Sequence, residues 1–118
     1  MKSKKVLLNL DDIFETKAIQ RKLESNGYEV LNAKKRKSDM ATFLESIEDI
    51  DTVIVDKYKR ELAVHYWIND NLPQHKTHII GLTSEAHPDQ DDIYSEIVKK
   101  PYATSEILDI VNKLVGNQ

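Results

Sequence analysis

The chain has 118 residues, enough to bury a sizeable core, and we expect residues 1–118 to form one domain. It contains no cysteine, which excludes disulfides, thiolate metal sites and a cysteine nucleophile. Its net charge of −3 argues against direct nucleic acid binding, and its apolar runs are too short for a bilayer span or a signal peptide, so we expect a cytoplasmic protein without membrane insertion.

The first half of the chain alternates short apolar runs with amphipathic segments. Residues 6–10 predict a buried strand, and residues 13–26 predict a helix because Ile19 and Leu23 recur four positions apart among charged residues. Gly27 is the expected C-cap of that helix. The next predicted elements are a strand at 28–31, a helix from Ser38 or Asp39 to Ile47, and a strand at 51–55 that is apolar on both faces.

The second half continues the alternation. It predicts a helix over 61–69, strands at 78–82 and 97–99, and a last helix capped by Thr104 that carries Ile107, Val111 and Leu114 on one face. The segment between the last two strands is polar and acidic, so its helix, the fourth, should be short or irregular. Strands that alternate with helices imply a parallel sheet with right-handed crossovers. We therefore predict an α/β fold, a three-layer, doubly wound sandwich around five parallel strands.

Polar side chains follow four of the predicted strands. They are Asp11 and Asp12, Asp56, Thr83 and Ser84, and Lys100. Ligands of such folds bind at the carboxyl ends of the strands, so we expect these side chains to gather at one edge of the sheet. Carboxylates packed together repel one another unless a cation lies between them, and hard oxygen ligands suit Mg²⁺. Asp56 is then a candidate nucleophile toward phosphorus, with Lys100 and the metal neutralising the phosphoryl oxygens.

The same residues, in this order along the chain, resemble the receiver domain family of response regulators. The flanking stretch from Asp11 through Leu23 to Gly27-Tyr28-Glu29-Val30 and Ala33 also looks like the family's first helix and second strand, and the resemblance covers nearly the whole chain. It implies a flavodoxin-like strand order, 2-1-3-4-5. It also implies two-component signalling, in which a sensor histidine kinase or a histidine phosphotransfer protein donates a phosphoryl group that switches contacts with a downstream protein target.

The resemblance also implies a role for each matching position. Asp56 would be the phosphoacceptor, and Asp11, Asp12, Asp56 and the backbone carbonyl of Tyr58 would hold Mg²⁺. The phosphoryl group would be bound by Thr83, Ser84 and Lys100, with a cis peptide bond between Lys100 and Pro101. Thr83 and the position of Ile97 would form the switch, and Tyr58 and Glu85 would tune dephosphorylation. Such a domain is not an enzyme with a separate substrate, although it catalyses its own phosphorylation and dephosphorylation.

Three departures from the family pattern concern the output rather than the chemistry. The gap from Thr83 to Lys100 is shorter than usual by about one helical turn. Ile97 stands where the family usually has Tyr or Phe, and the loop that begins at Lys57 lacks the usual proline. These departures predict a non-standard output surface, through the first or the last helix.

Two other functions fit parts of the sequence. Ile97 and the shortened fourth helix favour a pseudo-receiver, a docking module of the same fold that does not depend on phosphorylation. A flavodoxin-like binding domain for a phosphorylated small molecule is the more distant alternative. Asp11 and Asp12 have a plainer interpretation as acids favoured by a helix dipole, and a zinc site at His75 and His78 lacks further ligands placed by pattern.

Overall fold

The computed structural model describes residues 4–32, 50–56, 77–85 and 93–116. The elements in these ranges are β1 (Lys5–Asn9), α1 (Ile13–Glu24), β2 (Glu29–Asn32), β3 (Ile50–Asp56), β4 (His78–Thr83), β5 (Glu96–Lys99) and α4 (Thr104–Val115). All five predicted strands are confirmed, each within one or two residues of its expected bounds. The helices expected at 38–47 and 61–69, and most of the segment expected to hold a short fourth helix, lie outside the described residues.

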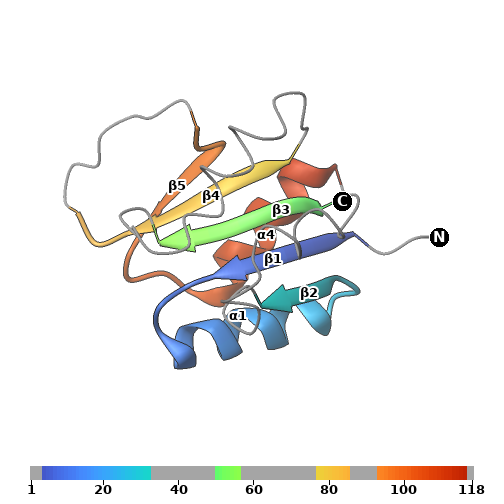
Figure 1. The fold of residues 1–118 in the computed structure, drawn as a ribbon, viewed down its shortest axis with the longest axis horizontal. Coiled ribbons are helices and arrows are strands. Elements are labelled where there is room, and N and C mark those ends of the chain that lie inside the picture. Colours follow the sequence, from blue (N-terminus) through green and yellow to red (C-terminus); the bar gives the residue numbers. More distant parts are fainter. Residues whose placement is uncertain (1–3, 33–49, 57–76, 86–92, 117–118) are drawn as a thin grey trace, which may run out of the picture.

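The five strands form one sheet in the order β2-β1-β3-β4-β5, and every neighbouring pair is parallel (Figure 1). This is the predicted order. The register places Leu8 of β1 beside Ile54 of β3, and Ile54 beside Ile80 of β4. Apolar residues at the centre of three adjacent strands therefore line up across the middle of the sheet.

Both faces of the sheet are buried, as the apolar strand at 53–55 predicted. Ile54 joins Leu8 and Ile80 in a large cluster that also receives residues of α1 and α4. Val53 and Val55 point to the other face, where they pack with Leu7 and Ile79. Alternate residues of one strand thus serve two cores, which is what a sheet covered on both sides requires.

The two described helices contribute to the same cluster, and Figure 1 shows α4 passing behind the strands. Ile19 and Leu23 of α1 and Ile107 and Val111 of α4 are almost completely buried, which confirms the predicted apolar faces. The Tyr28 hydroxyl donates to the Asn112 side-chain oxygen and so ties the start of β2 to α4. No helix in the described ranges is long and apolar enough to cross a membrane.

Two predicted helix caps are wrong. Helix α1 ends at the C-cap Ser25, in right-handed conformation, and Gly27 (φ 92°) instead turns the chain into β2. Thr104 is the first residue of α4 rather than its cap, because Ala103 takes the extended conformation before the helix and offers no side-chain oxygen. A threonine at the start of an apolar helical pattern can be either the N-cap or the first helical residue, and the sequence pattern did not distinguish these two positions for Thr104.

Candidate functional site

Asp56 lies at the carboxyl end of β3, where two groups from other elements reach its side chain. The backbone N–H of Asp11, just past β1, donates to Oδ2 at 2.8 Å. The Lys100 ammonium, just past β5, donates to Oδ1 at 3.2 Å. Each oxygen of the carboxylate thus has a donor, and residues separated by more than forty positions meet at the edge predicted from the strand ends.

Lys100 and Thr83 are fixed to each other through the backbone. The Lys100 N–H donates to the Thr83 carbonyl at 2.7 Å, which extends the β4–β5 pairing by one bond. The peptide bond from Lys100 to Pro101 is cis, as expected. The Thr83 side chain is buried, and its hydroxyl accepts the Glu85 N–H at 3.1 Å. The start of the loop after β4 is therefore held close to the base of the Lys100 side chain.

Asp12 serves as the N-cap of α1. Its Oδ1 accepts the backbone N–H groups of Phe14 and Glu15 at 2.8 and 3.1 Å, and the plainer interpretation of this acid is therefore correct as far as it goes. Both capping bonds use Oδ1, so the cap does not use Oδ2. The side chains of Asp11 and Asp12 are exposed at the mouth of the site.

The donor set fits a hydrated Mg²⁺ ion better than a dry metal cage. Within the part of the chain that the structure describes, no three acidic or histidine side chains are close enough to form a metal cluster by themselves. Magnesium keeps several of its waters and needs only one or two carboxylates together with phosphate oxygens. Exposed carboxylates at Asp11 and Asp12, beside a half-buried Asp56, meet that requirement.

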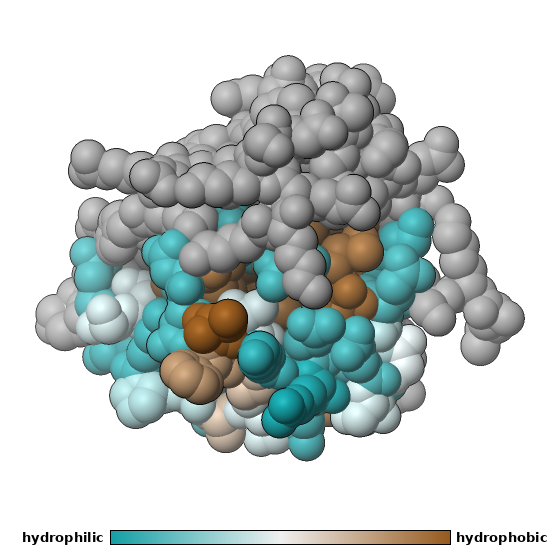
Figure 2. Space-filling view, turned by 60° about the horizontal axis from the view of Figure 1, so that its bottom comes forward, coloured by the Kyte–Doolittle hydropathy of each residue, from teal (hydrophilic) through white to brown (hydrophobic). Residues whose placement is uncertain are grey.

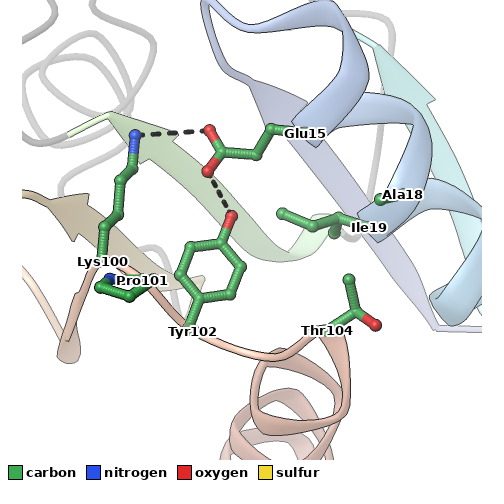
Figure 3. A pocket seen from close by; sticks show the side chains of 7 residues that line it. All are labelled: Glu15, Ala18, Ile19, Lys100, Pro101, Tyr102 and Thr104. Atoms are coloured by element: carbon green, nitrogen blue, oxygen red, sulfur yellow. Dashed lines mark hydrogen bonds and ion pairs between the residues drawn. The ribbon is translucent and has the colours of Figure 1, made fainter.

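Sequence reasoning missed two residues of this site, Glu15 and Tyr102. Glu15 Oε1 lies 3.5 Å from the Lys100 ammonium, and the Tyr102 hydroxyl donates to Glu15 Oε2 at 2.5 Å (Figure 3). A cavity of about 370 Å³ opens between α1 and the start of α4 and is lined by these groups together with Ala18, Ile19, Pro101 and Thr104. The spacing of Glu15 three residues after Asp12 puts the two acids on one side of a helix, and this was the only signal in the sequence that could have brought Glu15 to notice.

The electrostatics of these groups favour protonated Lys100 and Tyr102. Burial by itself lowers the pKa of Lys100, but the neighbouring Asp56 and then Glu15 outweigh it, and the net shift is upward. Burial, and then the hydrogen bond to Glu15, raise the pKa of the Tyr102 phenol far above its usual range. At neutral pH, Lys100 is therefore protonated and positively charged, and Tyr102 is protonated and donates a hydrogen bond.

The side chains of the other predicted site residues within the described ranges make none of the contacts described above. Ser84 and Glu85 are exposed beside Thr83, and Ile97 is half-buried in β5 opposite Gly81. Tyr58, together with His75, lies outside the described residues.

Two large apolar side chains in the first turn of α1, Ile13 and Phe14, are 61% and 80% exposed. Figure 2 shows hydrophobic side chains set among hydrophilic ones on the face that includes the bottom of Figure 1, where α1 lies.

Comparison with solved structures identifies the fold. The chain superposes on a response regulator from Thermotoga maritima with a TM-score of 0.74 and 24% identity, covering 98% of this chain and 99% of the other. The fold is that of a response regulator receiver domain. The chemotaxis response regulator CheY4 of Vibrio cholerae gives a TM-score of 0.75 at 20% identity, covering 96% and 99% of the two chains.

A third receiver structure carries ligands. It is the response regulator TrrA of Thermotoga maritima in complex with Mg²⁺-BeF, with a TM-score of 0.72, 25% identity, and coverage of 94% of this chain and 98% of the other. No family model matches the sequence, and no curated protein matches it. The receiver fold is thus evident from three-dimensional structure at low sequence identity.

Proposed function

We propose that residues 1–118 act in the cytoplasm as one receiver domain of a two-component system, in which Asp56 accepts a phosphoryl group from a sensor histidine kinase or histidine phosphotransfer protein. The observation that carries the proposal is the double engagement of the Asp56 carboxylate, by the Lys100 ammonium at 3.2 Å and the Asp11 N–H at 2.8 Å. A carboxylate held between a lysine and a backbone amide at a strand end is oriented for attack.

In the proposed reaction, an oxygen of Asp56 forms a bond to phosphorus while the bond from phosphorus to the donor's leaving atom breaks. The leaving group departs with the electron pair of that bond. Lys100 neutralises charge on the phosphoryl oxygens, and the Thr83 hydroxyl, which now accepts the Glu85 N–H, donates to one of them through its own proton. Asp11, Asp12, Asp56 and the Tyr58 carbonyl would hold Mg²⁺, which supplies further charge neutralisation when bound.

The proposed downstream effect is a change in a protein–protein contact surface. With Ile97 in place of an aromatic residue, the side chain in β5 has no ring to rotate between an inward and an outward position. Thr83 remains as a switch hydroxyl. Ser84 would bind the phosphoryl group together with Thr83 and Lys100, while Tyr58 and Glu85 would tune its hydrolysis. The target surface then lies nearer α1 or α4 than the usual face around β5.

The direct test is intact-mass measurement after incubation with Mg²⁺ and acetyl phosphate or phosphoramidate. Wild type should gain one phosphoryl group, while Asp56→Asn, which keeps the shape of the side chain, should gain none. Adding a chelator should abolish the adduct. A wild type that stays unmodified, with an intact fold and no binding of fluoroberyllate, would instead favour the pseudo-receiver, in which the same fold docks a partner without phosphorylation.

One observation favours the pseudo-receiver. Lys100 is already paired with Asp56 and Glu15, so the charge of the ammonium that would bind a phosphoryl group is compensated by contacts within the chain. A site that never exchanges these contacts would serve only to brace α1 against the end of β5.

A further inference from the structure

The Lys100 ammonium is shared between two carboxylates. Its Nζ lies 3.2 Å from Asp56 Oδ1 and 3.5 Å from Glu15 Oε1, and Figure 3 shows it turned toward Glu15 across the mouth of the cavity. The Lys100 side chain is 33% exposed, and the Glu15 side chain is only 16% exposed. An ion pair that is largely shielded from water interacts more strongly than one on an open surface.

Glu15 is held in this position from several directions. It occupies the first turn of α1, where its backbone N–H is bound by Asp12 Oδ1. The Tyr102 hydroxyl donates to Oε2, which leaves Oε1 facing Lys100. Ile19 and Pro101 line the same cavity, and the Glu15 side chain itself is only 16% exposed. The carboxylate is thus a fixed charge rather than a mobile surface acid.

We propose that Glu15 is a positioning residue that competes with the incoming phosphoryl group for the Lys100 ammonium and so restrains phosphorylation of Asp56. The inference rests on the proposed function, because it assigns a regulator to that same site. Lys100 has to turn its charge to the phosphoryl oxygens, and it does so by giving up its pairing with Glu15. Tyr102 keeps the released carboxylate in place, so that it recaptures Lys100 once the phosphoryl group has left.

The charges of the site point the same way. Two carboxylates, those of Asp56 and Glu15, contact the Lys100 ammonium, and the exposed acids Asp11 and Asp12 follow the neighbouring strand β1. Each extra negative charge strengthens the hold on a divalent cation and weakens the hold on an anion. Glu15 takes no part in the bonds made and broken, which join phosphorus to Asp56 and release the donor's leaving group. It therefore acts on the reaction only through Lys100 and the local field.

The test compares wild type with Glu15→Gln, which removes the charge but keeps the size of the side chain and an oxygen for the Tyr102 hydroxyl. At saturating Mg²⁺, the variant should be phosphorylated by acetyl phosphate about 3- to 10-fold faster and should bind fluoroberyllate more tightly by a similar factor. Its affinity for Mg²⁺ alone, measured by calorimetry, should fall by about 2- to 5-fold. These opposite shifts distinguish a role in the site from a purely structural one.

Two further variants serve as controls. Glu24→Gln makes the same chemical change at the other end of α1, where the carboxylate contacts Gln20, and it should leave all three constants unchanged. Glu15→Asp keeps the charge on a shorter side chain, and its constants should lie between those of wild type and Glu15→Gln. Thermal unfolding of each variant reports whether the fold is retained, and Glu15→Asp carries the comparison if Glu15→Gln does not fold.

Two outcomes would overturn the inference while the proposed function stands. In one, wild type accepts the phosphoryl group and Glu15→Gln is phosphorylated at the same rate. In the other, a folded Glu15→Gln is phosphorylated more slowly, which would make Glu15 a supporter of Lys100 rather than its competitor. Failure of the proposed function looks different, because wild type itself would then take up neither a phosphoryl group nor fluoroberyllate, and the inference would fall with it.

Discussion

Gly81, in the middle of β4, offers a sharp test of how the strand before the site is packed. A Cβ atom built at this position would lie 2.8 Å from both Cδ1 and Cε1 of the Tyr94 ring, at least 0.6 Å inside ordinary van der Waals contact. The Tyr94 ring lies flush against the bare backbone and packs with the cluster on that face of the sheet. The absence of a side chain at Gly81 is therefore what allows this close packing.

We expect Gly81→Ala to destabilise the fold. Displacing the half-buried ring costs about 1–3 kcal/mol, while replacing glycine by alanine in an ordinary strand conformation returns about 0.5–1 kcal/mol. The net loss of unfolding free energy is about 0–2.5 kcal/mol, or up to roughly 10 °C in the midpoint of thermal unfolding for a chain of this size. Urea denaturation followed by circular dichroism measures it.

A double-mutant cycle isolates the cause. In a Tyr94→Ala background the clash is gone, so adding Gly81→Ala should stabilise the chain by about 0.5–1 kcal/mol, which reverses the sign of the effect. If Gly81→Ala costs the same free energy with and without the ring, the overlap is not what makes glycine necessary there, and the packing argument fails.

Three other results are expected. Tyr28→Phe should lower the unfolding free energy by about 0.5–1.5 kcal/mol in urea denaturation, because Asn112 loses its donor; an unchanged midpoint would show that the bond contributes nothing. Lys100 and Tyr102 have folded-state pKa values above their ordinary values of 10.5 and 10.0, so the stability they add is complete below about pH 10 and is lost as the pH rises through the folded-state values. The midpoint of urea denaturation should thus decrease as the pH is raised above about 10, and it should decrease less steeply in Tyr102→Phe than in wild type. The same pH dependence in both proteins would show that Tyr102 does not contribute to this loss of stability. Mg²⁺ at ten times its dissociation constant should add about 1.4 kcal/mol of stability, reversed by a chelator, whereas no shift at any Mg²⁺ concentration would argue against a native-state site.

The strand ends were predictable because their cause is local in the sequence. An apolar run such as 53–55 needs cover on both faces, a parallel sheet provides it, and the residue that follows the run then lies at the functional edge. Asp56, Thr83 and Lys100 were found in this way, and the contacts from Asp56 to Lys100 and from Lys100 to Thr83 follow from that arrangement.

The pairing of Glu15 with Tyr102 was not predictable by the same route. The two residues are 87 positions apart, and they meet because α1 and the start of α4 converge over one face of the sheet. Glu15 looks like any acid in the first turn of a helix, where the helix dipole already explains it. Its role as a partner of Lys100 depends on the depth of the cavity and on the direction of the side chain, which periodicity does not encode.

The order in which the elements leave the ribosome has a consequence for how this chain folds. Strand β1 emerges first but occupies an inner position, so it stays incompletely paired until β3 follows it. Helix α4 follows all five strands in the chain and brings Ile107 and Val111, which complete the larger apolar cluster against α1. A nascent chain that stops before residue 104 would leave that face bare and prone to aggregation. The larger apolar cluster is therefore complete only when residues 104–115 have packed against it.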